Sequence, residues 1–390
     1  GAKGTIEKAS VSTKYLNEPV RNLYATFAME QGKAAIEAAS FSLGTSLYHV
    51  EAQTEDVNHP HMTGSVQTET VNVNELVALI KKDSGENSSS SSPSSPKQPP
   101  RTFSLELLVE ADSLYAGSTR TGPVSATWTY AKGLHSFDPI RLTSFGGDIQ
   151  GNLRLDTSGD SPTWTTQFEG RQVRLDQVVE QFRPEKAKVT GQLYVKGELS
   201  GIAKGGMPDI LASMDGKLDI NATDGEIRQY TMLKNIFLLM QVPLGTLLIP
   251  GIREAVLAST VVDVITSGGR SLDPSNISYS KLAGEWVISK GVAHSDEFRL
   301  ETGVAHLMFR GDINLPRSSM DMVVRATPLG TIGSLMGKIP IAGNGLQKAK
   351  ETVLSTDFLV RGPLSDPDVS LAAAEKLMGK NAEQRDSAKP

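Results

Sequence analysis

The sequence predicts a mainly β protein: an elongated, curved antiparallel sheet, groove or taco-like in shape, built from repeats, with a few short apolar helices near the C-terminal end. Many segments alternate apolar and polar residues with period two. Among the 390 residues, 36 glycines and 20 prolines favour turns over long helices. The hydrophobic fraction of 38% is low for a compact globule of this length and suits a thin sheet with a large surface.

The composition argues against several classes of function. A net charge of -5 does not suit a nucleic-acid partner, which requires a basic face. The chain contains no cysteine, which removes disulfides, thiol nucleophiles and Cys-ligated metals. The longest apolar run, Ile236–Met240, is far shorter than the roughly 20 residues that cross a bilayer. Residues Thr5–Ala9 already have a strand pattern, so we expect the chain to be a fragment of a longer protein.

The first β-repeat is expected over residues 1–83. It contains an alternating run at Leu23–Met29, a turn at Gln31-Gly32-Lys33, and a closing segment at Val71–Ile80. In the closing segment, the N-cap-like residue Asn74 is expected to begin a short helix.

The second β-repeat, residues 102–188, has the same features about 102–104 positions later. Its turn lies at Lys132-Gly133, and its closing segment at Val173–Phe182 has Asp176 in the N-cap-like place. Between the repeats, residues 84–101 are Ser- and Pro-rich and are expected to form an exposed, disordered loop. This loop is either a linker between domains or an insertion within one sheet, and the matching strand patterns on both sides favour the insertion.

A third copy of the repeat makes the pattern clearest. The segment Trp128–Ser136 resembles Trp286–Ser295, and an Arg-Leu pair follows each, at Arg141-Leu142 and Arg299-Leu300. Such hairpin-rich units are expected to stack into an elongated sheet.

The C-terminal β-region is expected over residues 189–371. A strand with Leu218 and Ile220 leads to a turn at Asp224-Gly225, and a helical insertion follows at 229–265, including a second helix at 252–265. A further apolar segment spans 328–354, and a polar tail spans 372–390.

Several short motifs of this region resemble the C-terminal region of AsmA-like proteins. They are Asp215–Ile220 with Asp224–Ile227, then Gly311–Leu315, and finally Phe358–Pro367. The resemblance covers about residues 189–369 and extends to the similar TamB and bridge-like lipid transfer proteins. It implies a long β-groove lined with apolar side chains and a periplasmic protein tethered to the inner membrane of a Gram-negative envelope. It also implies phospholipid transport and a role in outer-membrane biogenesis, and it supplies no catalytic residue.

The residue pattern agrees with a lipid-binding function. A strand of period two has one apolar face, and a single curled sheet would turn that face into a groove. Acyl chains would enter the groove at roughly 0.8 kcal/mol per buried methylene, while the headgroup stays in water. The expected cargo is therefore a phospholipid or other acyl lipid, and the resemblance implies two further partners, the membrane, through an inner-membrane anchor outside this fragment, and an envelope protein. The alternative is a structural or interaction module of the envelope whose β-core is filled by its own side chains.

The candidate groove or cap residues are the most apolar side chains of the C-terminal region. The helical ones either plug the sheet or contact lipid, and the two roles are compatible. The candidates are Leu218, Ile220, Leu233, Ile236, Phe237, Leu239, Met240, Leu244, Leu247, Leu248, Ile249, Leu329, Ile332, Leu335, Met336 and Ile339.

No catalytic residue, cofactor or metal is expected. His59-Pro60-His61 is the only close pair among six histidines, and two ligands fall short of a metal site. No Ser-His-Asp or Gly-x-Ser-x-Gly arrangement is present. The glycines at Gly146-Gly147 and Gly268-Gly269 lack the Lys-Ser/Thr of a phosphate loop. Trp128 and Trp286 share a repeat position and are expected to pack on the sheet.

Overall fold

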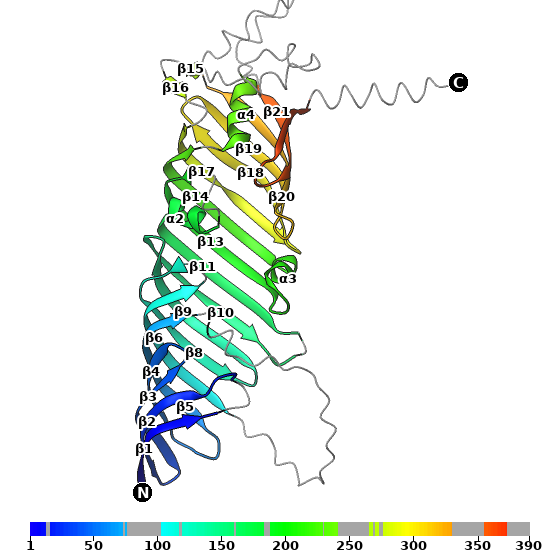
Figure 1. The fold of residues 1–390 in the computed structure, drawn as a ribbon. Helices are drawn as coiled ribbons and strands as arrows, with labels where there is room; N and C mark the ends of the chain where they lie inside the picture. Colours follow the sequence, from blue (N-terminus) through cyan, green and yellow to red (C-terminus); the bar gives the residue numbers. More distant parts are fainter. Residues whose placement is uncertain are drawn as a thin grey trace, which may run out of the picture. The chain divides into compact units, whose positions relative to one another are not determined.

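The computed structural model describes residues 1–12, 16–72, 75, 103–116, 119–159, 161–182, 188–228, 230–240, 265–267, 270–272, 276–329 and 355–372. The chain divides into two units, Gly1–Glu169 and Gly170–Pro390. Strands dominate each unit (Figure 1), which confirms the mainly β class with few short helices. The expected loop at 84–101, nearly all of the helix at 252–265, and nearly all of the polar tail lie outside the described residues.

Unit 1 is one sheet in which successive strands pair with each other. Its pairs run β1–β2, β2–β3, β3–β4, β4–β5, β5–β6, β6–β8, β8–β9 and β9–β10, with short β7 beside β6. The strands are β1 (Ala2–Val11), β2 (Val20–Glu30), β3 (Lys33–Leu43), β4 (Ser46–Thr54), β5 (His61–Asn72), β6 (Ser104–Ala116), β7 (Thr119–Arg120), β8 (Val124–Ala131), β9 (Leu134–Ser144) and β10 (Gly147–Asp156). The division between the units falls within β11 (Thr163–Arg174).

One pairing in unit 1 differs from the antiparallel pattern. Strands β5 and β6 are parallel, with His61 opposite Ser104 and Asn72 opposite Tyr115. A parallel pair requires a long crossover connection, and residues 73–103 supply its length. Because β5 and β6 are hydrogen-bonded neighbours, the Ser/Pro-rich segment lies between adjacent strands of one sheet and not between separate domains.

The repeated hairpins share one turn. Lys132 and Gly133 have φ values of 50° and 86°, and Lys290 and Gly291 have values of 48° and 75°. Gln31-Gly32 has the same pair of positive angles. Two positive φ values define a type I′ turn, whose twist matches that of the flanking strands, and glycine adopts the second angle without strain. These X-Gly pairs are therefore the local signal behind the repeats.

Unit 2 is an antiparallel sheet. Its pairs are β13–β14, β14–β17, β17–β18, β18–β19, β19–β20, β20–β21 and β21–β22. In addition, β12 pairs with β14, and β15 and β16 form a separate hairpin. Its elements are α2 (Leu175–Phe182), β12 (Lys188–Val189), β13 (Gln192–Ile202), α3 (Met207–Ala212), β14 (Asp215–Arg228), α4 (Thr231–Met240), β15 (Ile265–Ser267), β16 (Arg270–Leu272), β17 (Asn276–Ser289), β18 (Val292–Thr302), β19 (Ala305–Asn314), β20 (Ser319–Pro328), β21 (Thr356–Pro363) and β22 (Asp368–Leu371).

The start of α2 corrects one expectation. The helix begins at Leu175, so Asp176 lies in its first turn and is not the N-cap. Its carboxylate accepts a 2.6 Å hydrogen bond from Arg174. An acidic side chain in the first turn still stabilises the helix through its dipole, which is why this position resembles a cap in the sequence.

The expected turn at Asp224-Gly225 is wrong, because β14 continues through both residues. Asp224 adopts a φ of 53° inside the strand, a conformation that Asp tolerates better than most residues. On one side, β14 pairs with β13 and then with β12, and the register of this pairing shifts by one residue here. Gln192 of β13 lies opposite Thr223, whereas Val189 of β12 lies opposite Ile227. A β-bulge uses the same residue types as a turn, and the chain bends without reversing.

Candidate functional site

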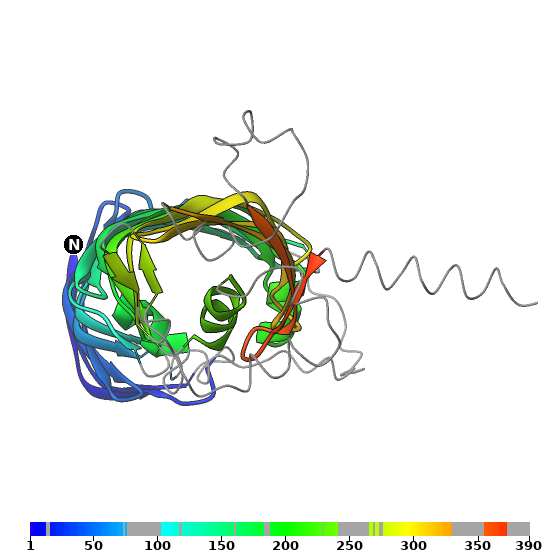
Figure 2. The same ribbon diagram turned by 90° about the horizontal axis from the view of Figure 1, so that it is seen from above.

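The concave face of unit 2 carries its apolar side chains, and we call this face of β14, β17, β18, β19, β20 and β21 the trough. Seen from above, these strands curve around α4 (Figure 2). Leu300, Leu307 and Val324 are almost fully buried, whereas Val323, which precedes Val324 in β20, is 37% exposed on the outer face. The alternation of the strands therefore separates an apolar inner face from a polar outer face.

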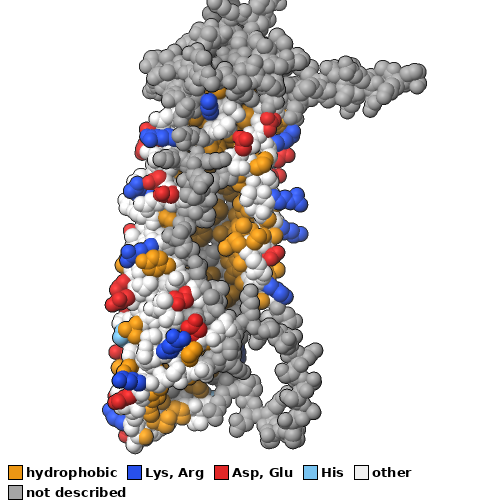
Figure 3. Space-filling view, viewed as in Figure 1, with side chains coloured by type: hydrophobic (Ala, Val, Ile, Leu, Met, Phe, Trp, Pro, Cys, Tyr) orange, Lys and Arg blue, Asp and Glu red, His pale blue; other side chains and the backbone are white. Residues whose placement is uncertain are grey.

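A cavity of about 220 Å³ lies between the trough and the start of α4. In Figure 3, hydrophobic side chains gather in the hollow of unit 2, and Lys and Arg side chains follow its edge. Among the residues that the structure describes, the lining is apolar except for the polar atoms of one tyrosine and one tryptophan. It consists of Val189, Ile227, Tyr230, Met232, Leu233, Leu282, Trp286, Phe298, Leu300, Phe309, Ile313, Met320, Met322 and Val360.

Three aromatic side chains form a row across this lining. Trp286 and Phe298 have ring centroids 5.3 Å apart, and Phe298 and Phe309 have centroids 6.2 Å apart in an edge-on arrangement. They come from the adjacent strands β17, β18 and β19, where cross-strand aromatic pairs stabilise a sheet. Trp286 thus packs on the sheet as expected and also lines the cavity.

Most of helix α4 is buried, and only Thr231 in its first turn is exposed. Ile236, Phe237 and Leu239 are at most 1% exposed, and Met240 is 7% exposed. The helix packs on β21 and β22, and its first turn faces the cavity through Met232 and Leu233. A short helix without an exposed apolar stripe behaves as part of a core.

The candidate residues fall into three groups. Leu233 lines the cavity, and the other described candidates in α4 are buried beside it. Leu218, Ile220 and Leu329 are half-buried and do not line it. The remaining candidates lie outside the described residues: Leu244, Leu247, Leu248, Ile249, Ile332, Leu335, Met336 and Ile339.

Most lining residues were not among the sequence candidates. They sit in strands, where only every second side chain faces the trough, as with Met320 and Met322 of β20. The signal that could have found them is this period-two alternation, read across neighbouring strands.

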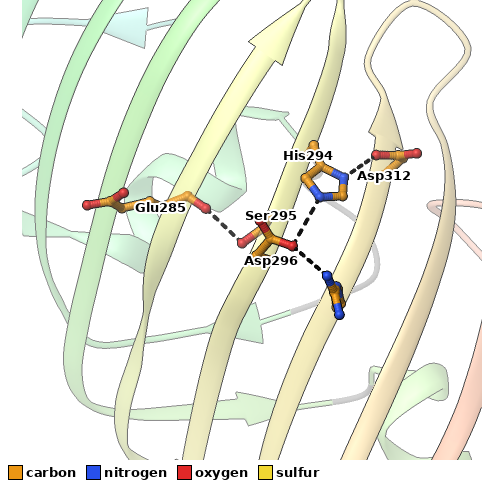
Figure 4. Close-up of polar contacts among 6 residues, drawn as sticks. Glu285, His294, Ser295, Asp296 and Asp312 are labelled. Carbon is orange, nitrogen blue, oxygen red and sulfur yellow. Dashed lines mark hydrogen bonds and ion pairs between the residues drawn. The ribbon is translucent and has the colours of Figure 1, made fainter.

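Polar side chains cluster on the outer face of β18 and β19 (Figure 4). His294 Nδ1 lies 2.6 Å from the Asp312 carboxylate, and its Nε2 lies 3.6 Å from the Asp296 carboxylate. Arg310 donates a 3.0 Å hydrogen bond to the same Asp296 oxygen. The hydrogen bond with Asp312 raises the pKa of His294 above its usual value.

The cluster around His294 predicts a pH effect. We expect an NMR titration to give His294 a pKa above 6.5, and Asp312→Asn to lower it more than Asp296→Asn does, because Asp312 makes the shorter contact. A folded-state pKa above the unfolded one stabilises unit 2 most below pH 6.5, and this contribution is lost as pH rises through the folded pKa. Equal shifts in both variants would contradict this account.

The other polar groups do not form a comparable site. His59 contacts Asp56 at 3.2 Å, whereas His61 contacts Ser104 at 2.9 Å, so the two members of the close pair have different partners. Among the described residues, no group of three or more His, Asp or Glu side chains is placed to hold a metal ion. A hollow of about 510 Å³ in unit 1 is lined partly by Glu37, Glu51 and Gln53, which do not suit an acyl chain.

The fold and the site define an open-sheet protein with an apolar trough in unit 2. Within the described part of the chain, no helix is long and apolar enough to span a membrane. Comparisons with protein-family models, curated proteins and solved structures gave no match to this chain.

Proposed function

We propose that unit 2 holds acyl chains of a phospholipid in the trough, shielding them from water while the headgroup remains outside. In the cell, the chain would be the periplasmic part of an inner-membrane-anchored protein that conveys phospholipid and supports outer-membrane biogenesis. The observation that carries the proposal is the apolar lining of the 220 Å³ cavity. This volume exceeds the ~150 Å³ of an apolar cavity that accepts benzene.

The size of the cavity favours a ligand over a self-filled core. The apolar side chains that face this 220 Å³ hollow lack packing partners on that side and lose dispersion contacts. An acyl chain would restore the lost contacts and would add roughly 0.8 kcal/mol for each buried methylene. The alternative, a structural module of the envelope without lipid cargo, is favoured by α4, whose own side chains already fill part of the trough.

The test is lipid extraction from the purified chain followed by mass spectrometry. We expect bound phospholipid, and we expect Ile313→Glu to reduce the bound amount at least tenfold, because a carboxylate in the apolar lining must be desolvated to admit a chain. Val323→Glu is the matched control, since it adds the same charge on the outer face. If the wild-type chain carries no lipid, or if both variants lose bound lipid equally, the result would favour the alternative function, a structural module without lipid cargo.

A further inference from the structure

We infer that the first turn of α4, through Met232 and Leu233, sets the length of acyl chain that the cavity accepts. This inference rests on the proposed function and adds a specificity determinant to it. The two side chains are the wall that α4 contributes, whereas nearly all the other described lining residues lie in strands.

Both side chains of the wall are buried, and the helix that carries them is held by contacts of its own. Met232 is 5% exposed and Leu233 is 2% exposed. The backbone N–H of Lys234 donates a 3.1 Å hydrogen bond to the Tyr230 carbonyl, which fixes the start of the helix. Since α4 also packs on β21 and β22, the helix that carries these two side chains lies within the curve of the strands (Figures 1 and 2).

Because the lining is apolar, the volume of the cavity is the property that distinguishes acyl chains of different length. An apolar surface offers a chain no directional contact, so chains that differ in length are distinguished by the number of methylenes that fit. Each additional buried methylene raises affinity about fourfold. A chain longer than the cavity gains nothing from its extra methylenes, so affinity reaches a plateau at a length that the wall sets.

Substitutions that change the size of Leu233 or Met232 would enlarge or shorten the cavity. Leu233→Ala removes three carbon atoms from the side chain and makes room for about two further methylenes, which corresponds to a gain of up to about 14-fold for the longer chain. Leu233→Phe moves the wall into the cavity and is expected to shift the plateau to shorter chains. Met232→Ala is a second enlarging variant that reports the same effect if Leu233→Ala does not fold.

The experiment first removes co-purified lipid from the chain and then titrates monoacyl phosphocholines that differ by two carbons, below their critical micelle concentrations, by calorimetry. We expect the plateau to move to longer chains in Leu233→Ala and to shorter ones in Leu233→Phe. Leu239→Ala is the matched control, because Leu239 is equally buried in α4 but does not line the cavity. A plateau unchanged in all variants that still bind would overturn the inference, whereas no binding of any chain length to the wild type would overturn the proposed function.

Discussion

Phe237→Ala is expected to lower the free energy of unfolding of unit 2 by about 3–5 kcal/mol. Phe237 is 1% exposed in α4, so its removal leaves a cavity as well as removing apolar area from the core. The helix has only ten residues, which is too short to be stable without such packing. We therefore expect α4 to detach from β21 and β22 well before the strands separate.

Urea unfolding followed by Trp286 fluorescence measures this loss. Trp286 is the tryptophan of unit 2, and Trp128→Phe with Trp164→Phe would make it the sole reporter. The control is Lys234→Ala in the same helix, where the side chain is only half-buried, and a change within about 0.5 kcal/mol is expected. A loss below about 1 kcal/mol in Phe237→Ala would mean that α4 is not part of the folded core.

The strands were predictable because their signals are local. Period-two alternation identifies a strand, and an X-Gly pair such as Lys132-Gly133 or Lys290-Gly291 identifies the hairpin turn that ends it. Both signals depend on the residues themselves. The mainly β class and the equivalence of the repeated hairpins follow from them without knowledge of the distant contacts.

The errors occurred where a local signal has two structural meanings. Asp and Gly tolerate unusual φ values in a bulge as well as in a turn, and only the neighbouring strand decides between them. The parallel pairing of β5 and β6 depends on which strands meet after a long connection, which no local pattern encodes.

The candidate site was only partly predictable, because consecutive apolar residues are easier to see than alternating ones. Irregular strand pairing also makes it difficult to predict from the sequence which residues of a strand share a face. Ile277 lies opposite Ile227, a cavity residue, and Trp286 also lines the cavity. Nine positions separate Ile277 from Trp286, so strict alternation would place them on opposite faces. The shift in pairing with β18 between Tyr279 and Lys281 marks the irregularity that brings both to the trough.

Gly225→Ala is expected to destabilise unit 2 by about 2–5 kcal/mol. A Cβ at this position would overlap the Thr190 carbonyl oxygen and would lie 2.6 Å from Tyr279 Cζ. The Tyr279 hydroxyl donates a 2.6 Å hydrogen bond to that carbonyl, so the new methyl group must displace the ring or the backbone. Either movement breaks the hydrogen bond that joins β17 to Thr190, which lies between β12 and β13.

The measurement combines urea unfolding with alkaline titration of Tyr279. Burial, with a smaller effect of Asp224, raises the pKa of Tyr279 to about 12, and we expect Gly225→Ala to return it toward 10 as the ring becomes exposed. Tyr279→Phe isolates the hydrogen bond and should cost about 1–3 kcal/mol. Gly206→Ala is the control in the same unit, since its Cβ would meet only Pro208 at an ordinary 3.6 Å. If Gly225→Ala is no more harmful than Gly206→Ala, Tyr279 does not pack across this glycine.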